Sequence, residues 1–405
     1  MISLARFGYP WGTLRHRIPL LLLVLAVGPF APKGAQAYTP PPLFRSSVNL
    51  QPASSCKSCH LDITDQWQRS AHSKADRGQN LLFGRMYFYS LKQTRGETMV
   101  ACGPCHETSS FVNQDFEGLR EVSAEGVNCV FCHSIDGPST TGVPPYSIEL
   151  GPYTGTVRSP MTTPSHKSKY SSFLTTSEFC GGCHKYSNQY GVPISDTYGE
   201  WKRSKYAKQG ITCQGCHMPG TSGRNASEGP VRPRVADHSF NHEDLGSRRP
   251  NAVLLKLRGE RRGDSLRFHA TVTNAGWGHS LPTGNDQNVV LLRVRVKSAE
   301  GEILWENDPF ADWDVSVFGV TLADEFGRGP ADTWNARSVV ADRRIKAGQS
   351  ADVRYDAPLG GANGALKVEA QLLFRRARPE TVVQYGLPEA YDTERVLVES
   401  SLSVP

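Results

Sequence analysis

The sequence predicts a mainly helical and irregular domain followed by an antiparallel β-sandwich domain. Three observations support this division. A five-residue pattern, CxxCH, occurs five times between residues 56 and 217 and nowhere else. Glycine and proline are frequent between its copies, which favours loops and short helices. From about residue 251 apolar and polar residues alternate, as they do in half-buried β-strands.

The first 37 residues have the pattern of a secretory signal. Arg15 and Arg17 precede an apolar run at residues 18–27, and residues 35–37 form a small-residue cleavage site. An uncleaved anchor is the alternative, but the run is shorter than the roughly 20 residues that span a bilayer. We therefore expect an exported protein, in the periplasm or at the cell surface, with no transmembrane segment in the mature chain.

Residues 38–52 contain three consecutive prolines and are expected to form an extended arm. The domain that follows is expected to span residues 53–248, and the second domain residues 249–405.

The five CxxCH motifs use all ten cysteines of the chain. Two thiols three positions apart can bond both vinyl groups of one haem, and the next residue, an imidazole, can bind its iron. Five motifs therefore predict five covalently bound haem c groups. The thioether cysteines would be Cys56, Cys59, Cys102, Cys105, Cys129, Cys132, Cys180, Cys183, Cys213 and Cys216, and the proximal iron ligands His60, His106, His133, His184 and His217.

Zinc ribbons and redox-active CxxC pairs are the alternative explanations of the motif. Four-cysteine zinc sites combine two CxxC units, and five units cannot be divided evenly among such sites. Neither alternative explains a histidine after every pair. The pattern thus favours a pentahaem cytochrome domain, whose interior would be built largely from haem faces, so that the haem-free chain should not fold alone.

The net charge gives no support for nucleic-acid binding. The formal charge is +6, but the signal carries four cations and no acid, and ionised haem propionates would bring the oxidised holoprotein to about −3.

An internal repeat lies within the first domain. The motif pair at residues 102–133 matches the pair at residues 180–217, including the Gly-x-x-Cys that opens the second motif of each. A second echo is Trp67-x-x-Ser70-x-His72 against Trp201-x-x-Ser204-x-Tyr206. We interpret this as a duplicated two-haem unit, which predicts haems stacked in close contact.

The second domain is predicted from its alternating strands. At residues 290–297 and 366–372 apolar side chains occupy every second position, and residues 266–273, 303–305 and 395–398 are further strand candidates. This pattern predicts an antiparallel β-sandwich without haem motifs. Its simplest role is that of a docking module.

Five histidines remain as candidates for the second, distal position on the five irons. They are His72, His166, His238, His242 and His279. His269 lies on the polar side of a predicted strand and is expected to be solvated instead. The methionines of the mature chain are expected to pack or lie exposed. Each candidate also has an ordinary alternative as a surface or core histidine.

Several segments resemble the cytochrome c-554 family, which is related to hydroxylamine oxidoreductase. They are Cys56 to His60 with Trp67-x-x-Ser70-x-His72, residues 126–133, His166 with residues 177–180, residues 200–204, and residues 213–219 with His238. Residues 278–284 resemble a turn in the β-domain of many secreted multihaem cytochromes. The resemblance implies an electron carrier with mostly bis-histidine haems and supports His72, His166 and His238 as distal ligands.

The chain departs from the family in haem number, since cytochrome c-554 is a tetrahaem protein without this sandwich. Which iron each distal histidine meets, and whether one haem is open, therefore cannot be carried over.

We expect electron transfer through five closely packed haems in an exported respiratory chain, between a redox protein donor and a redox protein acceptor. One alternative is a multihaem oxidoreductase that acts on a small nitrogen or sulfur compound at one open haem, with Tyr206 as a pocket residue. Another is the subunit of a homo-oligomer or an extracellular cytochrome filament.

Overall fold

The computed structural model describes residues 49–139, 145–160, 163–240 and 251–405. The predicted signal, most of the predicted arm, and His242 lie outside the described residues. Within these ranges, every helix is too short or too polar to cross a lipid bilayer.

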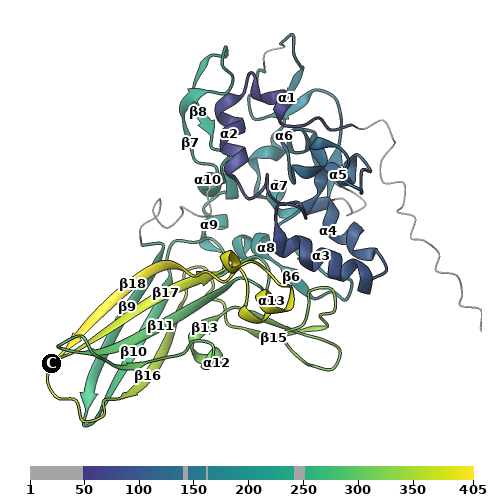
Figure 1. Cartoon of the computed structure of the whole chain (residues 1–405). Coiled ribbons are helices and arrows are strands. Elements are labelled where there is room, and N and C mark those ends of the chain that lie inside the picture. The colour runs from purple at the N-terminus through teal and green to yellow at the C-terminus, as the bar shows by residue number, and fades with distance from the viewer. Residues whose placement is uncertain (1–48, 140–144, 161–162, 241–250) are drawn as a thin grey trace, which may run out of the picture. The chain divides into compact units, whose positions relative to one another are not determined.

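The first region consists of short helices, with two-stranded ribbons between them (Figure 1). The helices are α1 (Ser54–Lys57), α2 (Leu61–Arg69), α3 (Leu81–Gln93), α4 (Glu97–His106), α5 (Thr108–Val112), α6 (Cys129–His133), α7 (Ser177–Gly181), α8 (Thr197–Lys202), α9 (Lys205–Lys208) and α10 (Cys213–His217). The single-turn 3₁₀ helices are η1 (Glu121–Ala124) and η2 (Phe173–Thr175). Every CxxCH motif overlaps one of the α-helices, so the motif cysteines are fixed by local hydrogen bonds.

The ribbons differ from the sequence prediction of loops and short helices. They are β1 (Ile135–Pro138) with β2 (Tyr146–Ile148), β3 (Tyr153–Gly155) with β4 (Ser168–Tyr170), β5 (Tyr186–Ser187) with β6 (Pro193–Ser195), and β7 (Gly220–Arg224) with β8 (Val231–Ala236). Most of these strands are short and lack buried alternate side chains, so their sequences carry no period-two pattern.

The internal repeat is also a structural repeat. The indole Nε1 of Trp67 donates to the Val127 carbonyl at 2.9 Å, and that of Trp201 donates to the Ile211 carbonyl at 2.9 Å. The residue after each of these carbonyls caps a motif helix: Asn128 accepts from the Phe131 N–H at 2.9 Å, and Thr212 accepts from the Gly215 N–H at 3.3 Å. The two copies therefore share a backbone frame.

The end of the predicted arm packs against the helical region. Leu50 is buried, its N–H donates to Asn113 Oδ1 at 2.8 Å, and Asn113 Nδ2 donates to the Leu50 carbonyl at 3.3 Å. These bonds anchor the chain just before the first motif.

The second region confirms the predicted antiparallel strands. One sheet has the order β16-β10-β9, and the other has the order β12-β11-β17-β18 with β13 paired to β11. The strands are β9 (Val253–Arg262), β10 (Ser265–Asn274), β11 (Val289–Ser298), β12 (Ile303–Glu306), β13 (Val317–Phe318), β16 (Ser350–Pro358), β17 (Leu366–Arg375) and β18 (Arg395–Val404). The ribbon β14 (Val320–Ala323) with β15 (Ser338–Asp342), the helices α12 (Trp313–Ser316) and α13 (Pro379–Gln384), and the turn η3 (Glu389–Tyr391) complete it.

One continuous apolar cluster contains residues of both sheets. Alternate residues of β10, from Leu266 to Val272, are fully buried and belong to the same cluster as alternate residues of β11 and β17. At the start of β11 the alternation fails, because Val289 and Leu291 are buried on the opposite face, against Trp313 of α12. A covered second face explains this continuous apolar run.

Candidate functional site

All five motifs line one cavity of about 2210 Å³. The ten motif cysteines, the five motif histidines and four of the predicted distal histidines contribute to its wall. Pockets for single small ligands occupy roughly 300–1,000 Å³, so this space is suited to several cofactors. Its lining includes side chains from both regions of the chain.

Four pairs of imidazoles face one another across this cavity. The ring centroids are 6.2 Å apart for His60 and His166, 6.4 Å for His133 and His238, 6.3 Å for His217 and His279, and 6.1 Å for His72 and His184. With metal–nitrogen bonds of about 2 Å on each side, plus the distance from each ring nitrogen to its centroid, an iron between two imidazoles would separate the centroids by roughly 6 Å. The four spacings fit bis-histidine iron.

The ring planes distinguish one pair from the other three. The planes enclose angles of 29°, 25° and 21° for the pairs of His60, His133 and His217. His72 and His184 enclose 80°. The first three pairs thus have nearly parallel imidazole planes, and the fourth has nearly perpendicular ones.

Hydrogen bonds at Nδ1 leave Nε2 free for a metal. Nδ1 of His133 donates to the Thr154 carbonyl at 2.6 Å, that of His238 to the Ala236 carbonyl at 2.9 Å, and that of His279 to the Ser280 carbonyl at 3.0 Å. His60 makes the same kind of bond to the Asn225 carbonyl. A proton on Nδ1 fixes the tautomer whose Nε2 lone pair can bind iron.

Burial favours the neutral imidazoles that iron requires. It lowers the pKa of His106 and of His238 to about 4 each, and it lowers the pKa of His133, His184 and His279. These rings are neutral near pH 7, which is the ligating form.

Three buried polar atoms at the cavity wall have no hydrogen-bond partner among the described residues. They are Trp277 Nε1, Gln214 Oε1 and His106 Nδ1. Buried polar groups normally have a partner. An indole N–H suits a haem propionate, so the residues present fit the group that the CxxCH motifs imply.

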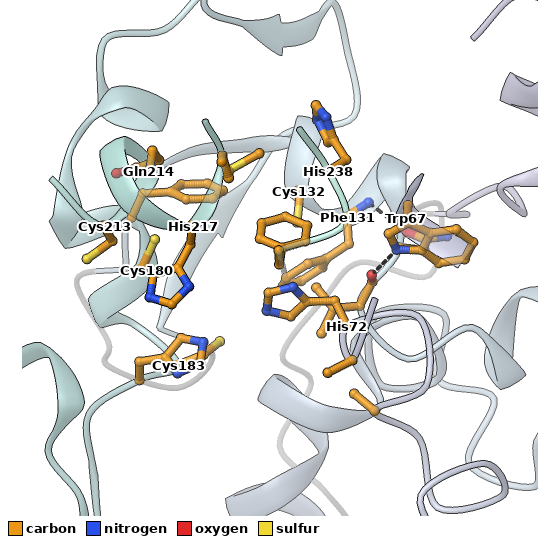
Figure 2. Close-up of a pocket in the computed structure, with 18 of the residues that line it drawn as sticks. Trp67, His72, Phe131, Cys132, Cys180, Cys183, Cys213, Gln214, His217 and His238 are labelled. Atoms are coloured by element: carbon orange, nitrogen blue, oxygen red, sulfur yellow. Dashed lines mark hydrogen bonds between the residues drawn. The ribbon is translucent and has the colours of Figure 1, made fainter. Parts of the chain in front are cut away.

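Cysteine side chains of neighbouring motifs lie close to one another. The thiols of Cys56 and Cys129 interact, as do those of Cys105 and Cys183 and those of Cys180 and Cys213. Figure 2 shows Cys180, Cys183, Cys213 and His217 gathered on one side of the cavity, with Cys132, Phe131 and His72 on the other. The first motif therefore adjoins the third, and the fourth adjoins both the second and the fifth.

His106 differs from the other motif histidines. Among the described residues, no imidazole faces it across the cavity; the ring of Phe83 stacks on it instead, with centroids 4.1 Å apart and an angle of 13°. His242, the fifth predicted distal ligand, lies outside the described residues. Sequence reasoning did not identify Phe83, because an apolar helix residue carries no signal of such contact.

The remaining predicted residues lie as follows. His269 is on β10 at the surface, with Nδ1 2.6 Å from a carboxylate oxygen of Asp352, and it does not line the cavity. Tyr206 does line it, and its hydroxyl donates to the Ala275 carbonyl at 3.4 Å. The ring of Tyr206 also packs against Gly278, beside His279.

Comparisons with known proteins agree with these features. The family model described as cytochrome c554 and c-prime matches residues 55–134. No curated protein matches the chain significantly.

Among solved structures, the chain is similar to a penta-heme cytochrome c552 from Thermochromatium tepidum, with a TM-score of 0.71 and 21% identity over 87% of this chain and 98% of that one. The C-terminal domain of wzt matches 38% of this chain and 74% of its own length at 9% identity. With a TM-score of 0.21, that second match carries no structural argument.

Proposed function

We propose that the chain is a multihaem c-type cytochrome, similar to the cytochrome c-554 family, that carries electrons through five covalently bound haem c groups in an exported respiratory chain. The observation that carries the proposal is the set of four imidazole pairs, each spaced for one iron, around a cavity lined by all five motifs. Haem iron, when bound, supplies the ferric–ferrous couple.

The histidines perform two tasks in this proposal. Paired imidazoles close both faces of an iron to substrates and favour lower potentials than histidine–methionine ligation does. The Nδ1 bonds to backbone carbonyls orient the rings and raise their basicity as ligands. We assign His166 to the motif of His60, His238 to that of His133, His279 to that of His217, and His72 to that of His184.

The sulfur contacts suggest the connectivity of the motifs. The fourth motif touches the second through Cys183 and Cys105, and the fifth through Cys180 and Cys213. The fourth motif is therefore the junction of the cluster, and the first motif, whose Cys59 is exposed, is an end suited to a protein donor or acceptor.

The predicted export agrees with a role in electron transfer. The predicted signal would deliver the chain to the periplasm or the cell surface, where c-type haem attachment is completed. The two sheets around a shared core are consistent with a β-sandwich from about residue 249 onward.

Mass spectrometry and redox titration of the secreted holoprotein test this function. We expect a mass increased by five haem groups and reversible reduction of five irons. Fewer than five attached haems, or irons that do not reduce and reoxidise reversibly, would refute the proposal.

A second candidate function rests on His106, whose ring faces no imidazole among the described residues. An iron held there would have a free position at which a small nitrogen or sulfur compound could be oxidised or reduced. Carbon monoxide binding to the reduced holoprotein tests this. One haem equivalent that binds carbon monoxide supports the candidate, whereas no binding rejects it and points to His242 as the sixth ligand.

A homo-oligomer or filament remains the third candidate. Electron microscopy of native material separates single particles from fibres.

A further inference from the structure

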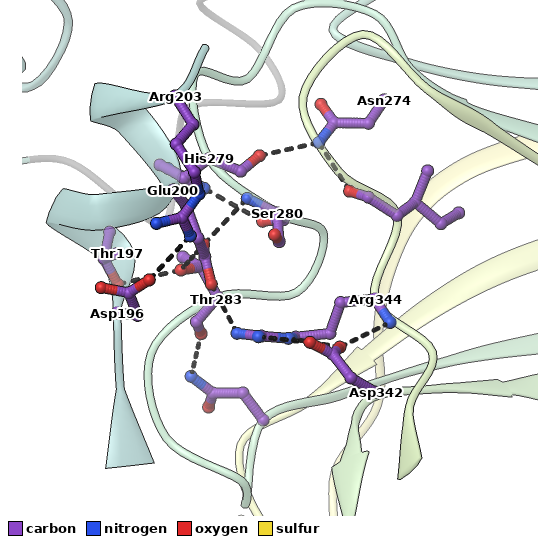
Figure 3. A network of polar contacts seen from close by, with 12 residues as sticks. Asp196, Thr197, Glu200, Arg203, Asn274, His279, Ser280, Thr283, Asp342 and Arg344 are labelled. Carbon is purple, nitrogen blue, oxygen red and sulfur yellow. Dashed lines mark hydrogen bonds and ion pairs between the residues drawn. The ribbon is translucent and has the colours of Figure 1, made fainter. Parts of the chain in front are cut away.

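A buried carboxylate joins the helical region to the loop that carries His279. Glu200 on α8 is 8% exposed. Its Oε2 accepts from the Ser280 N–H at 3.0 Å and from the Thr283 hydroxyl at 2.7 Å, and its Oε1 accepts from Arg344 at 2.5 Å (Figure 3). Ser280 is the residue next to His279, so one of these bonds holds the backbone at the predicted ligand.

The helix that carries Glu200 is itself tied to the haem motifs. α8 lies between the fourth and fifth motifs in the chain, and the N–H of its residue Tyr198 donates to the carbonyl of His184 at 3.0 Å. Thr197, at its first turn, shares a hydrogen bond of 2.9 Å with Thr283. The contacts of α8 thus run from a motif histidine to the loop of residues 278–284.

The same loop is held from the β-region by separate contacts. Asn274 Nδ2 donates to the His279 carbonyl at 2.8 Å and to the Ile345 carbonyl at 3.0 Å. Leu281 and Ile345 exchange backbone hydrogen bonds of 2.9 Å. These contacts fix the loop on its own sheets, whereas the bonds of Glu200 fix it against α8.

Nearby hydrogen-bond donors and Arg344 compensate the negative charge of Glu200. Arg344 bridges Glu200 and Asp342, whose contact with Arg344 is 2.8 Å. A buried carboxylate is costly unless it is paired and hydrogen-bonded. Here three donors meet its two oxygens, and loss of the carboxylate would leave the Ser280 N–H and the Arg344 guanidinium short of acceptors.

We propose that Glu200 is a positioning residue for iron ligation: it holds His279 opposite His217, so that a residue of the β-region completes the coordination of the fifth motif. This inference rests on the proposed function, in particular on the pairing of His217 with His279. It makes the β-region part of a redox centre, beyond the role of a docking module.

The test compares four variants of the secreted holoprotein: Glu200→Ala, Glu200→Gln, His279→Ala, and Glu178→Gln as a matched control. Glu178 on the neighbouring helix α7 accepts a hydrogen bond from the Tyr198 hydroxyl of α8 at 2.9 Å. The high-spin ferric fraction and the number of carbon-monoxide-binding haems are measured against the wild-type values.

We expect His279→Ala to add one high-spin, carbon-monoxide-binding haem, and Glu178→Gln to add none. Glu200→Ala should convert a large part of one haem to the high-spin, carbon-monoxide-binding form. Loss of hydrogen bonds to a charged group shifts the ligated population by on the order of tenfold. Glu200→Gln, which keeps one acceptor oxygen, should give a smaller change in the same direction. Added imidazole should return both Glu200 variants to low spin.

The outcomes separate the two levels of the claim. An unchanged spectrum of His279→Ala would remove His279 from the ligands, and with it this inference. A changed His279→Ala with Glu200 variants like wild type would overturn the role of Glu200 alone. Should Glu200→Ala fail to mature, Thr283→Val removes one of the bonds to Glu200, and it must still raise the high-spin fraction for the inference to stand.

Discussion

The ion pair of Arg77 and Glu107 should contribute strongly to the stability of the helical region. Arg77 Nη1 lies 2.9 Å from Glu107 Oε2, and the side chains are 19% and 6% exposed. Arg77 also donates to the Phe116 carbonyl at 2.6 Å and lies over the ring of Tyr87, 5.6 Å from its centroid. Since Glu107 follows His106, this pair fixes the end of the second motif.

The perturbation is Arg77→Met, which keeps much of the side-chain volume and removes the charge. Breaking a buried pair by removing one partner costs about 3–5 kcal/mol, because the remaining charge stays buried and uncompensated. For a region of this size that corresponds to roughly 6–20 °C in the unfolding midpoint. Arg203→Met is the matched control: Arg203 pairs with Asp196 at 2.7 Å but is 67% exposed, so its loss should cost at most about 1 kcal/mol.

Thermal unfolding of the holoprotein, followed by the haem absorbance, measures both effects. Glu107→Gln added to Arg77→Met should recover part of the loss, since it removes the stranded carboxylate. Equal midpoints for the two arginine variants, or no recovery in the double variant, would refute the reasoning that desolvation of Glu107 sets the cost.

Three further predictions concern other parts of the chain. Burial raises the pKa of Asp286 from 3.8 to about 6, so the folded state binds the carboxyl proton more tightly than the unfolded state does. The corresponding contribution to the free energy of unfolding, up to about 3 kcal/mol, is present below about pH 4 and is lost as the pH rises to about 6. Asp286→Asn should flatten that dependence in unfolding curves recorded from pH 4 to pH 7. Phe268→Ala, in the apolar cluster that contains residues of both sheets, should cost about 3–5 kcal/mol in denaturant unfolding. Phe326→Ala, at a side chain 71% exposed, should cost at most about 0.5 kcal/mol. Chain made without haem attachment should keep the strand signal in circular dichroism and lose the helical one, and full helical content in that material would contradict a haem-built interior.

Sequence reasoning predicted best where the signal is local. The alternation at residues 366–372 was sufficient to predict the strand β17. The CxxCH spacing was sufficient to predict that the cysteines line the cavity. Both depend on residues within one turn or one strand.

Contacts between distant residues could not be predicted in the same way. His60 and His166 are separated by more than a hundred residues, and five distal candidates allow many pairings with five motif histidines. Glu200 is a further example. It stands in a short helix with no periodic signal, and its importance comes from Ser280 and Arg344, which the fold brings to it.

The repeat shows how far a sequence echo can be taken. In the first copy the His72 carbonyl accepts from the Val127 N–H at 2.9 Å, and in the second the Tyr206 carbonyl accepts from the Ile211 N–H at 2.9 Å. The backbones are therefore equivalent, as the echo predicted. The side chains are not: the imidazole of His72 faces His184, while the Tyr206 hydroxyl bonds to Ala275.

This difference bears on the count of ligands. One copy of the loop places an imidazole opposite that of another motif, and the other copy has a phenol that bonds to the β-region. A repeat that doubles the motif histidines but not the distal ones requires distal imidazoles from other parts of the chain. The turn with His279 provides one such imidazole, opposite His217. Within the described residues, the motif of His106 is the one left without a partner imidazole. Equivalent backbone thus predicts where a side chain starts, and the identity of that side chain decides whether it reaches an iron.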